Sequence, residues 1–463
     1  MWESIRLQTG LGPRRPGSLA GQIQAKNLAC ELSARGLVNV REEEIPLTHW
    51  EPARANLEID GNPIDCFPIP HAKFTGEGGC EGRIVWAQDS GDWRGAIVAA
   101  EIRFPELDAK LLRKISMGEI DREDSLIDVR HPATWVRLGW HFYSKAVSKG
   151  AIGFIGIVKD QPGGSCKMYA PYGFREKDIL NKPLPGVWVS RSDAKKIRSA
   201  ARAKILTTGI HEKSRSSNVV GEIPGESEET LLLTCHHDSP FVSPVEDASG
   251  IATVLAIAEH FANQKRLKRR LVVLLSAGHF YGSVGTRTFI EKHRKDLLPH
   301  IVLALSIEHI AKEAVEDAAG KLVPTGKSEA AGVFLSFNQA IRQALLSEGK
   351  KSGVDRWVLL PAEGPLGDYP PTDGGDWYAA GVPIVNYISN PVYLLTDEDA
   401  EKWVDEENLP RVAKAFTGFL SAVDTIPRPT LARCDFPVRR FLMKALRLFT
   451  WAKSTRWGTA PVH

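Results

Sequence analysis

One stretch, residues 231–261 (LLLTCHHDSPFVSPVEDASGIATVLAIAEHF), restricts the fold more than any other part of the chain. It opens with an apolar run, 231–234, that is typical of a buried strand. A polar loop follows, and apolar residues then recur at helical spacing after Ser249, which we expect to cap that helix. Strand, loop and helix in this order form the first half of a βαβ unit. Ligands of open parallel sheets bind just outside the carboxyl ends of the strands, where this loop places His236 and Glu246.

Three further apolar runs resemble the first one and are also followed by polar residues. They are residues 271–276 (LVVLLS), 301–307 (IVLALSI) and 383–389 (PIVNYIS). Alternation of such strands with helical segments predicts an α/β fold, with a mostly parallel (mixed) sheet that carries helices on both faces. The strand ends would bring His279 and Glu308 to the same rim as His236.

The segment 66–205 has a different pattern, with short β-like runs separated by Gly and Asp turns. It contains "GRIVWA", a predicted helix over 133–148 that leads into "IGFIGIV", and "LPGVWVSRSDAKKI", which combines a strand and a short helix. These motifs resemble a protease-associated domain, with an unrelated α+β insertion as the alternative. Before this segment we predict a helix over 18–35, capped by Ser18, a strand near 38–44, and a polar stretch to about residue 65.

The expected organisation is therefore an α/β domain built from 1–65 and 206–424. It is interrupted by the inserted domain 66–205 and followed by a basic tail, 425–463.

Composition excludes several classes of protein. The 463 residues carry 59 basic and 56 acidic side chains, so the net charge of +3 gives no reason to expect nucleic acid as a partner. The first residues lack the apolar core of a signal peptide, and no run is long enough to span a membrane. Six cysteines occur without CxxC pairs. These features favour a reduced, cytoplasmic protein.

The residue types at the predicted rim suit a hydrolytic metal centre. His236, Glu246 and Glu308 would supply one imidazole nitrogen and two carboxylates, and would leave a position open for water. Singly, each residue is more commonly a surface residue or a loop cap, but three at one rim favour one bound divalent metal. Zinc is the first choice, and manganese and iron are compatible with the same ligands.

Several motifs along the chain are similar to those of the co-catalytic zinc aminopeptidase family, which also contains glutaminyl cyclases and glutamate carboxypeptidases. "TCHHDSPFVSPVEDASGIATVLAIAEHF" resembles the family's first metal-binding segment, "SAGHFYGSVGTRTFI" its Glu-Glu segment, and "LSIEH" its Asn-x-Asp segment. "TDGGDWYAAGVPIV" and "YLLTDEDAEKWVDEENL" look like its last two landmarks. The resemblance covers the N-terminal helix and residues 217–424, and it implies the fold expected above.

The resemblance also assigns roles, and this chain departs from several of them. His236 matches a metal-binding histidine, whereas Glu246 and Glu308 stand where the family has aspartates. Phe280 and Leu395 occupy the glutamate and histidine positions of the second metal site, so a second metal is not expected there.

The family's general base is a glutamate, and His279 stands in its place. An imidazole can accept a proton near neutral pH, so His279 could be the base, a fourth ligand or merely a packing residue. Asp238 matches an aspartate whose carboxylate would orient His236. His237 and His309 are spare imidazoles at the rim; either could substitute as a ligand, but we expect both to face solvent.

The tail combines eight basic residues and one Asp with interleaved aromatic residues. Residues 437–454 predict a helix with Phe441, Leu442, Ala445, Leu448 and Phe449 on one face. Such a basic amphipathic helix could dock on the core, on a sister subunit in a homo-oligomer, or on an acidic surface, and docking on protein is favoured.

Two functions follow from these observations. The first is a single-metal hydrolase of a peptide or small amide, in which His236, Glu246 and Glu308 hold the metal, His279 is the base and Asp238 assists. The second is a repurposed relative with the same fold, either a binding protein or an acyl-transfer or cyclase enzyme. Retention of three ligand-type residues at one site favours the first. Loss of the Glu-Glu pair argues against recognition of a free α-amine.

Overall fold

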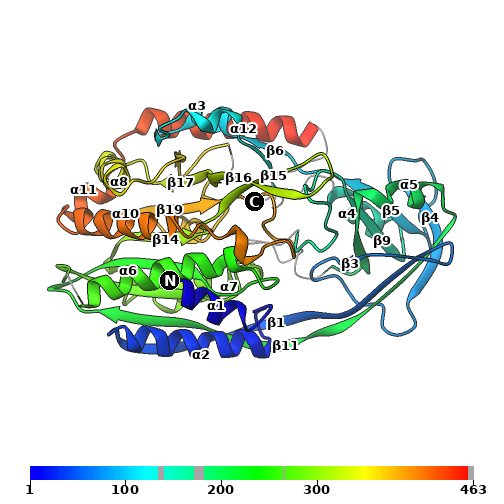
Figure 1. Cartoon of the computed structure of the whole chain (residues 1–463), viewed down its shortest axis with the longest axis horizontal. Coiled ribbons are helices and arrows are strands. Elements are labelled where there is room, and N and C mark those ends of the chain that lie inside the picture. Colours follow the sequence, from blue (N-terminus) through cyan, green and yellow to red (C-terminus); the bar gives the residue numbers. More distant parts are fainter. Residues whose placement is uncertain (134–139, 171–181, 264–265, 366, 457–463) are drawn as a thin grey trace.

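The computed structural model describes residues 1–133, 140–170, 182–263, 266–365 and 367–456, with the side chains of 140 and 448–456 left out of the description. A body with a central sheet lies on one side of the molecule and a smaller lobe on the other (Figure 1). The body strands are β11 (Arg202–Ile223), β13 (Arg269–Ser276), β12 (Ser227–His236), β14 (Ile301–Glu308), β19 (Ile384–Ser389), β17 (Ala331–Leu335), β18 (Trp357–Pro361) and β7 (Gly118–Ile120), in spatial order.

The four strands expected from apolar runs lie side by side at the centre of this sheet. β13, β12, β14 and β19 are all parallel to one another, whereas β11 and β17 flank them in the antiparallel direction. The predicted mixed α/β sheet is confirmed. Because the central strands are parallel, their carboxyl ends meet at one edge.

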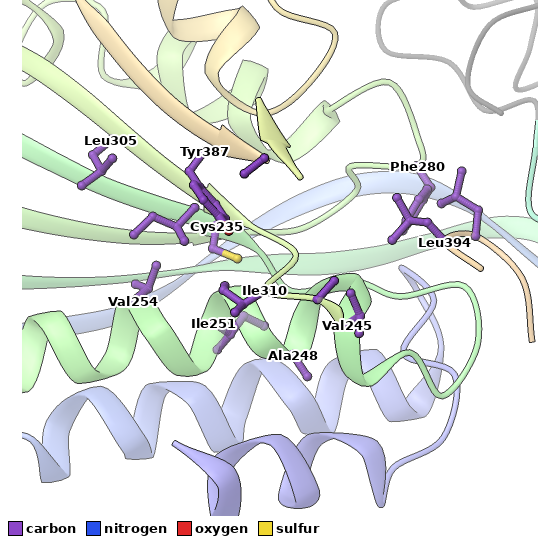
Figure 2. Packing of buried hydrophobic residues seen from close by; sticks show 14 of the residues in the cluster. Cys235, Val245, Ala248, Ile251, Val254, Phe280, Leu305, Ile310, Tyr387 and Leu394 are labelled. Atoms are coloured by element: carbon purple, nitrogen blue, oxygen red, sulfur yellow. The ribbon is translucent and has the colours of Figure 1, made fainter. Parts of the chain in front are cut away.

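Helices cover both faces, because alternate residues of each central strand point to opposite sides. On β12, Leu231, Leu233 and Cys235 belong to one core and Leu232 to another. The helices α2 (Leu19–Ala34), α6 (Gly250–Asn263), α8 (Gln339–Ser352) and α10 (Asn408–Val423) pack on the first core, and α7 (Val284–Lys292) and α9 (Gly374–Ala379) on the second. Figure 2 shows Ile251 and Val254 of α6 lying beneath the strands that carry Cys235 and Leu305.

The sequence predicted the N-terminal capping residues of two helices, α2 and α6. Ser18 caps α2, since its side chain accepts from the amide of Gly21 at 3.0 Å. The expected cap of α6 is wrong, because the Ser249 hydroxyl donates to the carbonyl of Val245 at 3.0 Å instead. The carboxylate of Asp247 accepts from the amide of Gly250 at 3.2 Å.

The lobe contains β3 (Phe67–Pro68), β4 (Cys80–Trp86), β5 (Ile97–Ile102), β9 (Gly153–Val158) and β10 (Gly186–Ser190), with α4 (Trp140–Ser148) and α5 (Ala194–Ser199). Each strand expected in this segment is present. Of the helix expected over 133–148, residues 134–139 lie outside the described part of the chain, and α4 accounts for the rest.

A long two-stranded ribbon joins the body to the lobe (Figure 1). It consists of β1 (Val38–Ile59) paired with β11 in the antiparallel direction, from Val38 opposite Glu222 to Ile59 opposite Ala203. The expectation of a short strand followed by a polar stretch is therefore wrong. Much of β1 is exposed, so its polar sequence lacks the apolar alternation on which the prediction relied.

Residues 105–133, here called the arm, leave the lobe and reach the opposite edge of the body sheet. The arm includes β6 (Glu106–Asp108), α3 (Ala109–Ile115), β7 and β8 (Arg130–Pro132). β7 pairs with β18, whereas the lobe strands continue the sheet on the far side of β11. The inserted segment thus contacts the body at both ends of the sheet.

The tail forms α11 (Arg428–Ala432) and α12 (Pro437–Arg456), and Phe441 and Leu442 of the predicted apolar face point away from the body, while the side chains of Leu448 and Phe449 lie outside the description. Phe441 and Leu442 are 70% and 54% exposed, whereas Met443 is buried. Basic side chains hold the helix instead, since Arg440 and Lys444 both pair with Glu363. Met443 and these ion pairs therefore seat α12 together.

The remaining elements are α1 (Trp2–Thr9), β2 (Asn62–Ile64), β15 (Lys312–Glu316) and β16 (Leu322–Ser328). Within the described residues, no helix combines the length and the apolar character needed to cross a membrane.

Candidate metal centre

The ends of neighbouring parallel strands bring the predicted site residues together. His236 is the last residue of β12 and Glu308 the last residue of β14, and these strands pair directly. His279 follows the end of β13 by three residues. All three side chains are buried. The predicted convergence at one edge of the sheet is therefore observed.

The ring of His236 is held by the backbone of the loop that follows it. Its Nδ1 lies 3.0 Å from the carbonyl oxygen of Asp238, to which it can donate, and its Nε2 then faces Glu246 at 3.1 Å. Burial opposes protonation of His236, but the surrounding carboxylates, above all Glu246, outweigh it and raise its pKa well above the usual range. The surrounding carboxylates therefore favour a positive charge at Nε2 of His236, either a proton or a metal ion.

We expected the carboxylate of Asp238 to orient His236, but it bonds to other residues. It accepts hydrogen bonds from the amides of His279 at 3.1 Å and Phe280 at 3.3 Å, and lies 3.7 Å from Nδ1 of His236. Asp238 therefore fixes the loop after β13, while its backbone oxygen orients His236.

Glu246 lies between two imidazoles. One carboxylate oxygen is 3.1 Å from Nε2 of His236, and the other is 2.7 Å from Nε2 of His309. Burial alone would raise the pKa of Glu246, but the two rings lower it strongly. The pKa of His309 rises in return, to about 10, against the effect of its own burial.

The spare histidines do not face solvent, so that expectation is wrong. His309 is 3% exposed, and its Nδ1 lies 2.8 Å from the carbonyl of Ser389. His237 is 1% exposed, and its Nε2 lies 2.8 Å from the carbonyl of Ser217. Of the two, only His309 contacts a predicted ligand.

Glu308 has one oxygen engaged and one without a partner. Its Oε1 accepts from Nδ2 of Asn386 at 3.0 Å and from the hydroxyl of Thr372, whereas Oε2 has no hydrogen-bond partner among the described residues. Burial, reinforced by nearby Asp373, raises the pKa of Glu308. Sequence reasoning missed Thr372 and Asn386.

His279 is paired with an aspartate that sequence reasoning also missed. Its Nδ1 lies 2.7 Å from Oδ1 of Asp373, the residue immediately before α9. Burial and the neighbouring His236 lower the pKa of His279 to about 4, so the ring is neutral at physiological pH. The segment "TDGGDW" resembles a family landmark, but nothing in its pattern marks Asp373 as a partner of His279.

The arrangement leaves buried ligand-type atoms without hydrogen bonds. Within the described residues these are Oε2 of Glu308 and Oδ2 of Asp373, whereas Nε2 of His236 and Nε2 of His309 both face the carboxylate of Glu246. Two groups of three have ligand atoms within 4.8 Å of one another: His236 with His279 and Glu308, and His236 with Asp247 and His309. Buried polar atoms without partners are costly, and a divalent metal would relieve that cost. His236 and Glu308 therefore fit such an ion together with His279, whereas the predicted ligand Glu246 belongs to neither group.

Arg14 steadies the loop that connects His236 to Glu246, and sequence reasoning gave no hint of it. This guanidinium is fully buried and donates to the carbonyls of Val242 at 2.8 Å and Ser243 at 3.2 Å. Burial lowers the pKa of Arg14 to about 10, but the nearby acidic residues oppose that fall. The loop is thus held in place from the N-terminal segment.

A pocket opens beside these residues. His279, Glu308 and His309 lie at one part of its lining, and most of the remaining lining is aliphatic. The empty space amounts to about 940 Å³, including the opening to solvent. A small peptide or amide has room next to the ligand-type atoms.

Comparison with known proteins identifies the segment that carries this site. Residues 218–416 match the model of peptidase family M28. This segment belongs to peptidase family M28. The resemblance inferred from its motifs is therefore confirmed. A comparison with curated protein sequences finds no match.

Solved structures share the fold over most of the chain. A peptidase M28 precursor from Shewanella amazonensis SB2B has a TM-score of 0.68 at 17% identity and covers 91% of each chain. BSAP, a zinc aminopeptidase from Bacillus subtilis, has a TM-score of 0.65 at 15% identity, covering 90% of this chain and 93% of its own. An aminopeptidase from Aneurinibacillus sp. strain AM-1 has a TM-score of 0.60 at 15% identity, covering 90% and 92%. The shared fold thus extends well beyond the M28 segment.

Phe280 and Leu395, which the resemblance matched to ligand positions of a second metal site, are both buried. Phe280 is 1% exposed, with its ring edge-on to His236 at 5.6 Å between centroids. Leu395 is 2% exposed and lines the pocket. Figure 2 shows Phe280 beside Leu394, the neighbour of Leu395, at the end of the core. Neither side chain can coordinate a metal.

Proposed function

We propose that this protein is a metal-dependent, peptidase-like hydrolase that works with a single divalent metal, zinc first, with manganese and iron as alternatives. Its membership of peptidase family M28 supports the general class. The observation that carries the proposal is the cluster of buried imidazoles and carboxylates at the strand ends, with Oε2 of Glu308 unsatisfied, beside an open pocket.

In this proposal His236, Glu246 and Glu308 hold the metal. His236 and Glu246 already lie 3.1 Å apart, and Asn386 fixes the carboxylate of Glu308. His309 orients Glu246 from the other side. A metal bound there would polarise a substrate carbonyl and lower the pKa of a water molecule.

His279 is the proposed base. Its Nδ1 donates to Asp373, so Nε2 is the atom that would accept a proton from the attacking water and pass it to the departing amine. The lowered pKa of the ring keeps it unprotonated at neutral pH. Asp238 assists by holding the backbone amide of His279.

The substrate would be a peptide or a small amide bound in the pocket. His279 and Phe280 stand where the family has its Glu-Glu pair, so a free α-amine lacks its usual carboxylate partner. The lobe, which we propose to be a protease-associated-like domain, would limit access to the pocket through its arm.

A second function remains open, that of a repurposed relative that binds a ligand or transfers an acyl group. Phe280 and Leu395, both apolar at positions of the second metal site, favour it. The hydrolase is expected to carry metal and to release amine from an amide, and a binding protein is not.

The test is metal analysis of the gently purified protein beside Glu308→Ala. We expect about one equivalent of metal in the wild type and a large loss in the variant. Glu228→Ala is the matched control, because that side chain is 86% exposed and remote from the site. Metal-free wild type, with the fold intact by circular dichroism, would overturn the hydrolase proposal in favour of a binding function.

A further inference from the structure

The pocket has a second polar region, away from the ligand-type residues. It is formed by His131 on β8 of the arm and Glu329 just before β17, and both residues line the pocket. Nδ1 of His131 lies 3.5 Å from a carboxylate oxygen of Glu329 and 2.9 Å from the carbonyl of Asn390. An acidic group therefore sits in an otherwise aliphatic part of the pocket.

Glu329 is buried with one oxygen unsatisfied. The side chain is 1% exposed, and Oε1 accepts from the amide of Ala330 at 2.8 Å. Oε2 has no hydrogen-bond partner among the described residues. Burial raises the pKa of this carboxyl, which shows how poorly the empty pocket supports its charge. A bound donor would remove that cost.

The nearest cation of the protein is already committed elsewhere. Arg356 donates to Glu313 at 2.6 Å and to the carbonyl of Ser328. Ligand atoms of His131, Glu313 and Glu329 lie within 4.8 Å of one another, as a metal site would require. Both oxygens of Glu313, however, accept hydrogen bonds from Arg356 and Thr325. A metal would have to displace these bonds, whereas a ligand ammonium needs only the free oxygen of Glu329.

The apolar walls of the pocket suit a flexible hydrocarbon chain. Leu112 and Val129 of the arm face the pocket together with Phe334 and Leu360 of the body. We propose that Glu329, assisted by His131, binds the primary ammonium at the end of an aliphatic side chain of the substrate. A lysine-type residue has this chemistry. The inference rests on the proposed function for placing the substrate amide at the other polar region.

The experiment compares binding of L-lysinamide and L-norleucinamide to the full-length protein by calorimetry. The two probes share the α-amine, the amide and the aliphatic chain, and differ in the terminal ammonium. We expect lysinamide to bind about 10-fold tighter or more, because a charge-assisted hydrogen bond to a buried carboxylate is worth about that factor. In Glu329→Gln the preference should shrink to about 3-fold or less.

Glu291→Gln is the control variant, since it removes the same charge from a side chain that is 70% exposed and does not line the pocket. It should retain the preference. Equal binding of both probes, tighter binding of norleucinamide, or failure of both to bind at millimolar concentration would overturn the inference. Ammonia release from lysinamide is measured separately: preferential binding without release contradicts the proposed hydrolase alone, and release without preference contradicts the recognition of the ammonium alone.

Discussion

The imidazole rings of His236 and His279 stack with their centroids 4.1 Å apart and their planes at 17°. Two positive charges at this separation repel strongly, so protonation of one ring disfavours protonation of the other. The carboxylates around His236 raise its pKa, whereas burial and His236 itself lower that of His279. The two stacked rings therefore differ in charge preference: His236 favours a bound cation, whereas His279 stays neutral and can accept a proton.

His279→Ala should abolish turnover of an amide substrate and leave the metal content unchanged. The physical reason is that a positioned base contributes about 100-fold or more to rate, while the proposed ligands stay in place. The measurement is kcat together with metal analysis of the same preparation. A loss of metal comparable to that in Glu308→Ala would instead make His279 a ligand.

Arg14→Ala should lower the free energy of unfolding by about 3 kcal/mol or more, because buried carbonyls lose a charged donor. Denaturant unfolding measures this value, and metal titration should show weaker binding, since the loop before Glu246 loses its support.

Arg215→Ala is the control for Arg14. Arg215 pairs with Glu44 on the surface, with side chains 72% and 59% exposed, so we expect a change below about 1 kcal/mol. Equal effects of the two substitutions would contradict the structural role of Arg14.

The orientation of α12 can be tested with one exposed and one buried side chain. Phe441→Ser should change the free energy of unfolding by no more than about 0.5 kcal/mol, because the ring is 70% exposed. Met443→Ala should cost about 2 kcal/mol, because that side chain packs on the core. The reverse order, read from thermal or denaturant unfolding, would indicate that the helix docks with its other face.

Glu43 predicts a pH dependence of stability that is independent of the metal centre. Burial alone would raise its pKa, but Lys292, His293 and Arg41 outweigh it and lower the pKa below 4.5. A carboxyl with a lowered folded pKa stabilises the protein above its unfolded pKa, and that contribution is lost as the pH falls through the folded value. Glu43→Gln should therefore be less stable than wild type at pH 7, and the difference should shrink below about pH 4.5.

Unfolding of Glu43→Gln and wild type at several pH values between 7 and 3.5 measures the difference. Glu42→Gln, which alters an exposed neighbour, is the control and should show little difference at any pH. A constant difference for Glu43→Gln across this range would contradict the lowered pKa.

The central strands could be read from the sequence because each is an apolar run, and the positions of His236 and Glu308 because they end two of these runs. Local patterns carry that information. Arg14, Asp373 and Asn386 could not be found in this way, since their partners lie far along the chain and no periodicity marks them. The β1–β11 ribbon was missed for a related reason. An exposed strand is held by hydrogen bonds to its partner strand and does not need the apolar alternation on which the prediction relied.

Burial of His309 also could not be predicted from sequence. A histidine after a strand normally suits solvent, but here Glu246 offers it a charged partner inside the protein. The helix α12 shows the reverse case, in which Phe441 and Leu442 stay outside and ion pairs with Glu363 help to seat the helix.

The arm closes one wall of the pocket, yet it provides none of the atoms proposed to hold the metal. The arm thereby shares in the proposed selectivity, together with Glu329 of the body, without carrying the proposed metal ligands. Changes within residues 105–133 can retune which side chains are admitted while the reactive groups keep their geometry, and the arm is accordingly the place to start when redirecting this scaffold toward other amides.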